Sequence, residues 1–135
     1  MRRLLFDTNT LNYILKGRRP VLDRYEQAVQ ADCTFLLSPV AHYELARYLL
    51  LKGAHRLARD YDRLTASWER CDLVFGDWET AASLWAERHR TGDSISDLDL
   101  LLAILARREE AVLVTTNTRH FAGLEIPLED WAAPL

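Results

Sequence analysis

The sequence is poor in cysteine, with only Cys33 and Cys71 among its 135 residues. Two thiols so far apart form neither a disulfide framework nor a thiolate metal site, so we expect free thiols in a reducing compartment. Long uncharged apolar runs are also missing, and the first apolar run meets an aspartate after three residues. This pattern excludes a membrane-spanning segment and predicts a soluble, cytoplasmic protein with no membrane contact.

The chain has no excess of positive charge, because its formal net charge is −3. A polynucleotide substrate is therefore neither supported nor excluded, and its binding would depend on local basic patches. Internal repeats, low-complexity tracts and linkers rich in proline and glycine are absent as well. With 49% apolar residues, the sequence suits one globular domain covering residues 1–135.

Buried-strand patterns alternate along the chain with segments of helical periodicity. The expected strands are residues 3–6, 33–38, 71–75 and 111–117, and the expected helices are residues 10–15, 19–31, 40–52, 54–70, 78–90 and 95–108. The last of these helices is apolar on nearly every side, which indicates burial. Strands separated by helices predict an α/β fold of three layers, with a mostly parallel sheet of four to five strands flanked by helices.

Four polar residues follow strands or occupy the first turns of the helices after them: Asp7, Glu44, Asp99 and Asn117. Each has a purely structural alternative. Asp7 suits a helix N-cap, Asp99 follows Ser96 at capping-box spacing, Asn117 is a common turn residue, and Glu44 suits a solvated helix face. What favours a site is that all four fall at the same edge of the expected sheet.

Carboxylates brought together at that edge repel one another unless a cation neutralises them. Oxygen ligands without histidine or cysteine predict Mg²⁺, with Mn²⁺ as the other possibility. Asp7, Glu44 and Asp99 are the expected metal ligands. Asp97 and Asp99 cannot equally face one ion, because residues two apart on a helix point in different directions.

Four stretches of the sequence together resemble the PIN-domain ribonucleases of the VapC toxin family. They are LLFDTNTLNYIL, SPVAHYELAR, GDSISDLDLLLAILA and VLVTTNTRHFAGL with IPLEDW, and they cover essentially the whole chain in the right order. The resemblance identifies Asp7, Glu44 and Asp99 with the acidic residues of that family, and it makes Asp97, an additional acid at a variable position, the second choice of metal ligand. Asn117 stands where many members have aspartate, and Thr115 matches a polar position beside it.

The resemblance implies a PIN-like fold and an Mg²⁺-dependent endoribonuclease, the toxin of a type II toxin–antitoxin pair. It places Asp7, Glu44, Asp99 and Asn117 in the catalytic site and implies an RNA substrate, a VapB-type antitoxin and a homodimer. A carboxylate-bound ion suits hydrolysis of a phosphodiester by an activated water. Because Asn117 departs from the family pattern, the alternative is a PIN-like protein that binds RNA or a partner without cleaving.

Other features of the sequence narrow this interpretation. A phosphotransferase of the haloacid-dehalogenase type is disfavoured because Asn9 stands where its second acid is needed. No histidine has an evident partner for covalent catalysis, and His120 is expected to be an ordinary surface residue. Trp78 and Trp85 share one apolar helix face, which predicts core or a subunit interface rather than base stacking. Lys16, Arg18 and Arg19, with Arg119, are the expected phosphate contacts.

Overall fold

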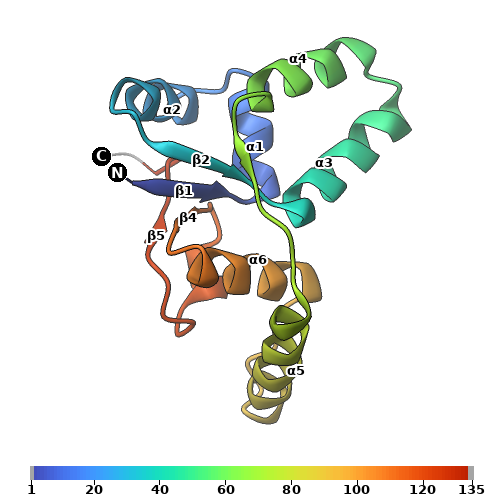
Figure 1. Ribbon diagram of the computed structural model, residues 1–135, viewed down its shortest axis with the longest axis vertical. Helices are drawn as coiled ribbons and strands as arrows, with labels where there is room; N and C mark the ends of the chain where they lie inside the picture. Colours follow the sequence, from blue (N-terminus) through green and yellow to red (C-terminus); the bar gives the residue numbers. More distant parts are fainter. Residues whose placement is uncertain (1, 134–135) are drawn as a thin grey trace.

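The protein is described by a computed structural model that places residues 2–133, and Figure 1 shows its arrangement. The chain alternates strands and helices, as the periodicity predicts. The elements are β1 (Arg3–Phe6), α1 (Thr8–Leu15), α2 (Val21–Gln30), β2 (Thr34–Leu37), α3 (Pro39–Lys52), α4 (His55–Thr65), β3 (Glu69–Arg70), α5 (Phe75–Arg90), α6 (Asp97–Arg108), β4 (Val112–Val114), the short 3₁₀ helix η1 (Thr118–Phe121) and β5 (Leu128–Glu129).

The five strands form one sheet in the order β3-β2-β1-β4-β5, and every neighbouring pair is parallel. The chain builds the sheet outward from β1 in one direction through β2 and β3, and then adds β4 and β5 on the other side. The order therefore reverses between β1 and β4, which is where open α/β sheets place their ligand sites, beyond the carboxyl ends of the strands. The predicted α/β class with a parallel sheet is confirmed.

Alternate residues of β1 enter two separate hydrophobic cores, because successive side chains of a strand point to opposite faces. Leu4 and Phe6 pack with the α1–α4 side of the sheet, whereas Leu5 packs with α6. Figure 1 shows the resulting layers, with α1 to α4 on one face of the sheet and α6 then α5 on the other. Burial on both faces explains why the strands read as continuous apolar runs.

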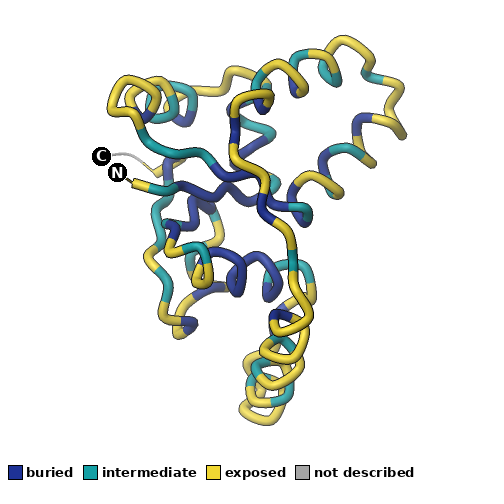
Figure 2. Tube along the Cα trace, viewed as in Figure 1, coloured by how far each residue is buried: buried dark blue, intermediate teal, exposed yellow. Residues whose placement is uncertain are grey.

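Helix α6 is the central support of the second core. Its residues from Leu100 through Ala106 are all buried, and Figure 2 shows this helix in the buried colour along most of its length. The side chain of Ser96 caps the helix by accepting a hydrogen bond from the backbone N–H of Asp99 at 3.3 Å. The predicted buried helix is confirmed, and its first turn lies at the carboxyl edge of the sheet.

The strand predicted at residues 71–75 is wrong, because residues 71–74 form an irregular connection and Phe75 already begins α5. The strand at this edge is β3, only two residues long, at positions assigned to the preceding helix by its periodicity. Cys71 continues the pairing with one hydrogen bond to the carbonyl of Leu37 at 3.2 Å. Leu73 packs against the second core, whereas Val74 and Phe75 are exposed, so this apolar run is not a buried strand.

Helix α5 lies outside α6 and is largely exposed, with Asp77 as its one buried residue (Figures 1 and 2). The prediction that Trp78 and Trp85 share one face is confirmed, since both line a groove between α5 and α6. Of the two predicted alternatives, a place in the core is wrong, because Trp78 is 52% and Trp85 43% exposed. The face of α5 that carries Trp78 and Trp85 is thus an apolar surface that the described residues leave partly uncovered. No helix within residues 2–133 combines the length and apolar character needed to span a bilayer.

An ion pair ties the start of α5 to α6. Asp77 is 4% exposed, accepts a hydrogen bond from the backbone N–H of Val74 at 2.9 Å, and accepts from Nε of Arg108 at 3.1 and 3.2 Å. Asp77→Ala removes the acceptor of both bonds, so we expect the free energy of unfolding to fall by about 1 to 2 kcal/mol. Urea unfolding followed by circular dichroism measures this loss.

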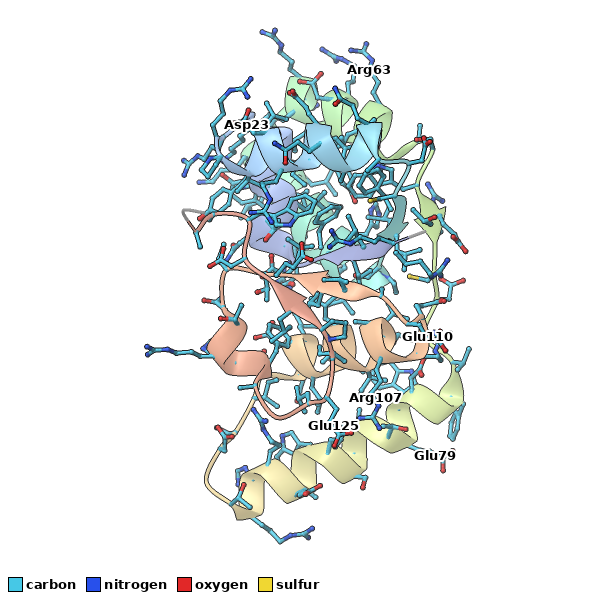
Figure 3. The ribbon with its side chains drawn as sticks, turned by 90° about the vertical axis from the view of Figure 1, so that its left-hand side faces the viewer. Asp23, Arg63, Glu79, Arg107, Glu110 and Glu125 are labelled. Atoms are coloured by element: carbon cyan, nitrogen blue, oxygen red, sulfur yellow. The ribbon has the colours of Figure 1, made fainter. Side chains whose placement is uncertain are left out.

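The matched control for Asp77 is Glu79→Ala on the same helix. Figure 3 shows the side chain of Glu79 projecting away from the body of the protein, and the residue is exposed. Its replacement should change the free energy of unfolding by less than about 0.5 kcal/mol. Equal losses for the two variants would mean that the contact with Arg108 contributes nothing to the docking of α5.

Candidate functional site

Asp7 lies at the point where the sheet order reverses, directly after β1. Its backbone N–H donates to the carbonyl of Val114 at 3.1 Å, which continues the ladder between β1 and β4. One carboxylate oxygen, Oδ1, accepts from the backbone N–H of Thr10 at 2.8 Å, and the other, Oδ2, accepts from the hydroxyl of Thr115. Asp7 is thus the N-cap of α1, as the structural alternative predicted, and also a residue fixed between two strands.

Burial governs the ionisation of Asp7, because this residue is only 7% exposed. Desolvation raises its pKa from the ordinary value of 3.8, while the hydrogen bonds from Thr115 and Thr10 lower it and the charge of Asp99 raises it further. The net pKa is raised. A carboxylate kept ionised in such a place destabilises the fold unless a cation joins it, and perturbed acids of this kind concentrate at functional sites.

Asp99 lies on the other side of the same edge, in the first turn of α6. Its charge acts on the pKa of Asp7, and its Oδ2 lies 3.7 Å from Nδ1 of His120. The capping-box alternative is only half present, because Ser96 caps the Asp99 N–H while no bond returns from the Asp99 side chain to the N–H of Ser96 within residues 2–133. The Asp99 carboxylate is therefore free of a capping role.

Asp97 points elsewhere. It is exposed and lines the groove of Trp78 and Trp85 between α5 and α6. The two acids of this turn thus face different surroundings, as their helical spacing predicts.

Glu44 reaches the site from α3, the helix that follows β2. Its Oε1 accepts a hydrogen bond from the hydroxyl of Thr8 at 2.7 Å, so α3 and α1 are joined beside Asp7. Glu44 and Thr8 also line a groove of about 680 Å³ between these helices. The other lining residues are Asn9, Asn12, Leu45, Arg47, Tyr48 and Leu51.

Asn117 contributes to the edge through its backbone. Its N–H donates to the hydroxyl oxygen of Thr115 at 3.0 Å, and Thr115 donates in turn to Asp7. Its side chain makes no cap bond to η1 and the residue is exposed. The structure therefore places Asn117 behind Thr115, and the direct role of its amide stays a prediction.

The donor set at this edge suits a hard divalent cation. The available atoms are carboxylate and hydroxyl oxygens, the ligands that Mg²⁺ and Mn²⁺ prefer. Within residues 2–133, however, no three Asp, Glu, His or Cys side chains are grouped closely enough to hold an ion together. The residues fit an open site, since Mg²⁺ usually keeps several waters and takes one or two carboxylates together with substrate phosphate. The shared three-carboxylate site stays a prediction.

The sequence interpretation missed two contacts at this edge. His120 was expected to be an ordinary surface residue, yet it lies against Asp99, because η1 turns back over the start of α6. Thr8 was not singled out, although it is the residue that holds Glu44. Thr8 directly follows Asp7, and His120 lies three residues after Asn117. This closeness to predicted site residues is the signal that the sequence offered.

Comparisons with known proteins agree with this geometry. The family model of the PIN domain matches residues 4–125, and no curated protein matches the sequence. A chain of the VapBC2 complex from Rickettsia felis, bound to a promoter DNA fragment, superposes with a TM-score of 0.82 at 24% identity over 94% of this chain and 97% of that chain.

Two further solved structures extend the likeness. A chain of VapBC-1 from nontypeable Haemophilus influenzae gives a TM-score of 0.77 at 21% identity over 97% of this chain and 99% of that chain. VapC20 of Mycobacterium tuberculosis, described as a toxin that cleaves the sarcin–ricin loop, gives a TM-score of 0.66 at 14% identity over 89% of this chain and 95% of that chain. At such identities these likenesses establish the shared fold.

Proposed function

The chain belongs to the PIN domain family, and on that premise we propose that it is a metal-dependent endoribonuclease, the toxin of a type II toxin–antitoxin pair acting in the cytoplasm. The observation that carries the proposal is the buried Asp7 carboxylate at the switch point of the sheet, held from both sides by Thr10 and Thr115 and facing the charge of Asp99. An RNA substrate is supported by the likeness to VapC20, a toxin that cleaves an RNA loop.

In this proposal Asp7, Asp99 and Glu44 hold Mg²⁺ or Mn²⁺, and Asn117 supports the site through Thr115. When bound, the ion supplies positive charge at the scissile phosphate and lowers the pKa of nearby water. The protein's part is to keep Asp7 ionised and oriented in a buried position, and to hold Glu44 through Thr8. Water is the nucleophile, so the expected products carry a 5′-phosphate.

Basic side chains beyond α1 are the proposed contacts to the RNA backbone. Lys16 lies over the ring of Tyr48 at 5.5 Å and Arg18 over the ring of Tyr13 at 5.3 Å. Both are exposed, and neither has an acidic partner within residues 2–133. Arg19 is a weaker candidate because it pairs with Asp23.

An antitoxin of the VapB type is the proposed partner, and the groove between α1 and α3 is its proposed binding surface. Leu51 of α3 lines this groove together with Glu44 and is 83% exposed, which leaves an apolar side chain at the rim that a partner segment would cover. An arginine or lysine of that segment would neutralise the carboxylates in the place of the ion. The similarity to chains of VapBC complexes supports such a partner.

A homodimer is also proposed, through the uncovered face of α5. The groove there has a volume of about 410 Å³ and is lined by Trp78, Ala81, Ala82, Trp85, Asp97, Leu100 and Leu101. Exposed aromatic side chains beside small alanines suit close packing of a second helix. Sedimentation of the purified chain tests this, and a monomer at high micromolar concentration would remove the homodimer from the proposal.

The function is tested with purified protein, an RNA oligonucleotide and MgCl₂ or EDTA. We expect cleavage that requires the ion, products with 5′-phosphate ends, and a large loss of cleavage in Asp7→Asn. Co-expression with the adjacent small gene should relieve growth inhibition and give a complex on size exclusion. RNA binding without cleavage by the wild type, in Mg²⁺ and in Mn²⁺, would favour the alternative of a PIN-like binding protein.

Thr115→Val tests the support of Asp7. Thr115 is fully buried, and its hydroxyl lowers the pKa of Asp7 by donating to the ionised carboxylate. Without that hydroxyl we expect a further rise in the Asp7 pKa and a loss of Mg²⁺ affinity of about tenfold, as for other residues that orient metal ligands. The increase of melting temperature with MgCl₂ concentration measures the affinity.

Thr80→Val is the matched control, because Thr80 lies on α5 and its hydroxyl bonds only to the carbonyl of Gly76 within residues 2–133. The Mg²⁺ affinity of this variant should equal that of the wild type. An unchanged affinity in Thr115→Val would show that Thr115 does not act on a metal ligand.

A further inference from the structure

Arg88, in the last turn of α5, is a largely enclosed arginine that the proposed site does not use. Its side chain is 12% exposed. Three of its nitrogens donate to backbone carbonyl oxygens: Nε to Asp93 at 2.9 Å, Nη1 to Ala122 at 3.0 Å and Nη2 to His120 at 3.1 Å. The guanidinium thus joins two chain segments that are far apart in sequence.

Both segments lead to Asp99. Asp93 belongs to the connection that delivers Ser96, the residue that caps the Asp99 N–H. His120 belongs to η1 and places its Nδ1 3.7 Å from Oδ2 of Asp99. The start of α6 and the segment that covers it are therefore held in register by one side chain behind them.

The arrangement depends on arginine in particular. A planar guanidinium presents five N–H donors in a fixed fork, whereas a lysine ammonium is a point charge that cannot meet three carbonyls spread over that fork. The ion pair with Asp93 contributes less, because that carboxylate is 71% exposed and lies 3.6 Å away. The carbonyl bonds, and not the charge alone, define what Arg88 does.

We propose that Arg88 is a positioning residue that fixes Asp99 for RNA cleavage, by holding the α5–α6 connection and the His120 segment against each other. The inference rests on the proposed nuclease function. It assigns to the outer helix α5 a role in the geometry of a site that none of its own residues enters.

The experiment compares Arg88→Ala and Arg88→Lys with Arg90→Ala. Arg90 lies in the same turn and is exposed, and its side chain makes no hydrogen bond or ion pair inside the described part of the chain. For both Arg88 variants we expect kcat for RNA cleavage to fall about tenfold with KM within about twofold, because orientation of the reacting groups and not RNA binding is lost. Arg90→Ala should match the wild type in both constants.

Hydrogen exchange provides a readout that needs neither metal nor RNA. The amide of His120 donates to Asn117 at 3.0 Å and that of Leu124 to Phe121 at 3.3 Å, so peptides covering residues 117–124 should lose protection in the Arg88 variants and keep it in Arg90→Ala. Arg88→Lys retains the charge and the aliphatic stem, which keeps the test available if Arg88→Ala does not fold.

A double-mutant cycle with His120→Ala shows whether the two residues act together. If Arg88 acts through η1, the double variant should be about as slow as the slower single variant, instead of showing the product of the two losses. Fully multiplied losses, or a rise of KM with unchanged kcat, would overturn the proposal. So would wild-type cleavage by Arg88 variants whose residues 117–124 have lost protection, or unchanged protection in those variants. A wild type that cleaves no RNA refutes the nuclease function alone, since hydrogen exchange still tests the link made by Arg88.

Discussion

Asp7→Asn is expected to reduce RNA cleavage by about 100-fold or more while raising the melting temperature of the metal-free protein by about 2 to 5 °C. The loss of activity follows from removing the most constrained carboxylate of the site. The gain in stability follows from desolvation, which raises the pKa of Asp7 above 3.8. Asparagine can still cap α1, because its side-chain oxygen accepts from the N–H of Thr10.

The sign of the pH dependence follows from the same shift. A folded-state pKa above the unfolded value means that the native protein binds the proton more tightly, so stability falls as the pH rises from 3.8 to the folded pKa of Asp7 and the loss is complete above it. The stability difference between wild type and Asp7→Asn should therefore be largest near pH 7 and shrink as the pH falls through the folded pKa toward 3.8.

Thermal unfolding from pH 4 to pH 8, with and without MgCl₂, measures these effects. Added Mg²⁺ should raise the melting temperature of the wild type and leave that of Asp7→Asn unchanged, since ligand bound to the native state stabilises it. A variant that is less stable than the wild type at neutral pH would show that Asp7 is a structural cap and not a charge held for a ligand.

Asp99→Asn should lower kcat for RNA cleavage by about 100-fold, whereas Asp97→Asn should stay within about threefold of the wild type. Both acids lie in the first turn of α6 and interact similarly with the helix dipole, so their loss should affect stability about equally. Only Asp99 faces Asp7 and His120, while Asp97 lines the tryptophan groove.

Single-turnover cleavage rates on one RNA oligonucleotide separate the two variants, and Mg²⁺ titration followed by melting temperature separates their metal binding. An inactive Asp97→Asn beside an active Asp99→Asn would reverse the assignment of the ligand. Loss of activity in both would point to the charge of the helix start instead of one coordinating side chain.

Much of the architecture could be read from the sequence because burial dominates it. The continuous apolar runs around Leu5 and Leu113 and the fully apolar helix from Leu100 to Ala106 leave few alternatives to a covered parallel sheet. Asp7 and Asn117 were predicted at the carboxyl edge for the same reason, since an abrupt polar residue after such a run marks the end of a strand. These features depend on neighbours in sequence.

The parts that could not be predicted depend on neighbours in space. The two residues of β3 make a strand only because β2 lies beside them. Trp85 shares the spacing of a core residue, yet it stays 43% exposed because α6 does not cover it fully. The contacts of His120 with Asp99 and of Thr8 with Glu44 join residues 21 and 36 positions apart. No local pattern encodes such pairs.

Both outer strands of the sheet, β3 and β5, are only two residues long. A strand from another protein would find few free backbone groups there, and charged side chains surround these edges, with Arg3 close to Glu69 and Arg2 paired with Glu129. Addition of a partner strand, the mode of recognition called β-augmentation, is therefore disfavoured at either end of the sheet. The surfaces that this fold offers to a partner are therefore its helices and connecting loops, and not the edges of its sheet.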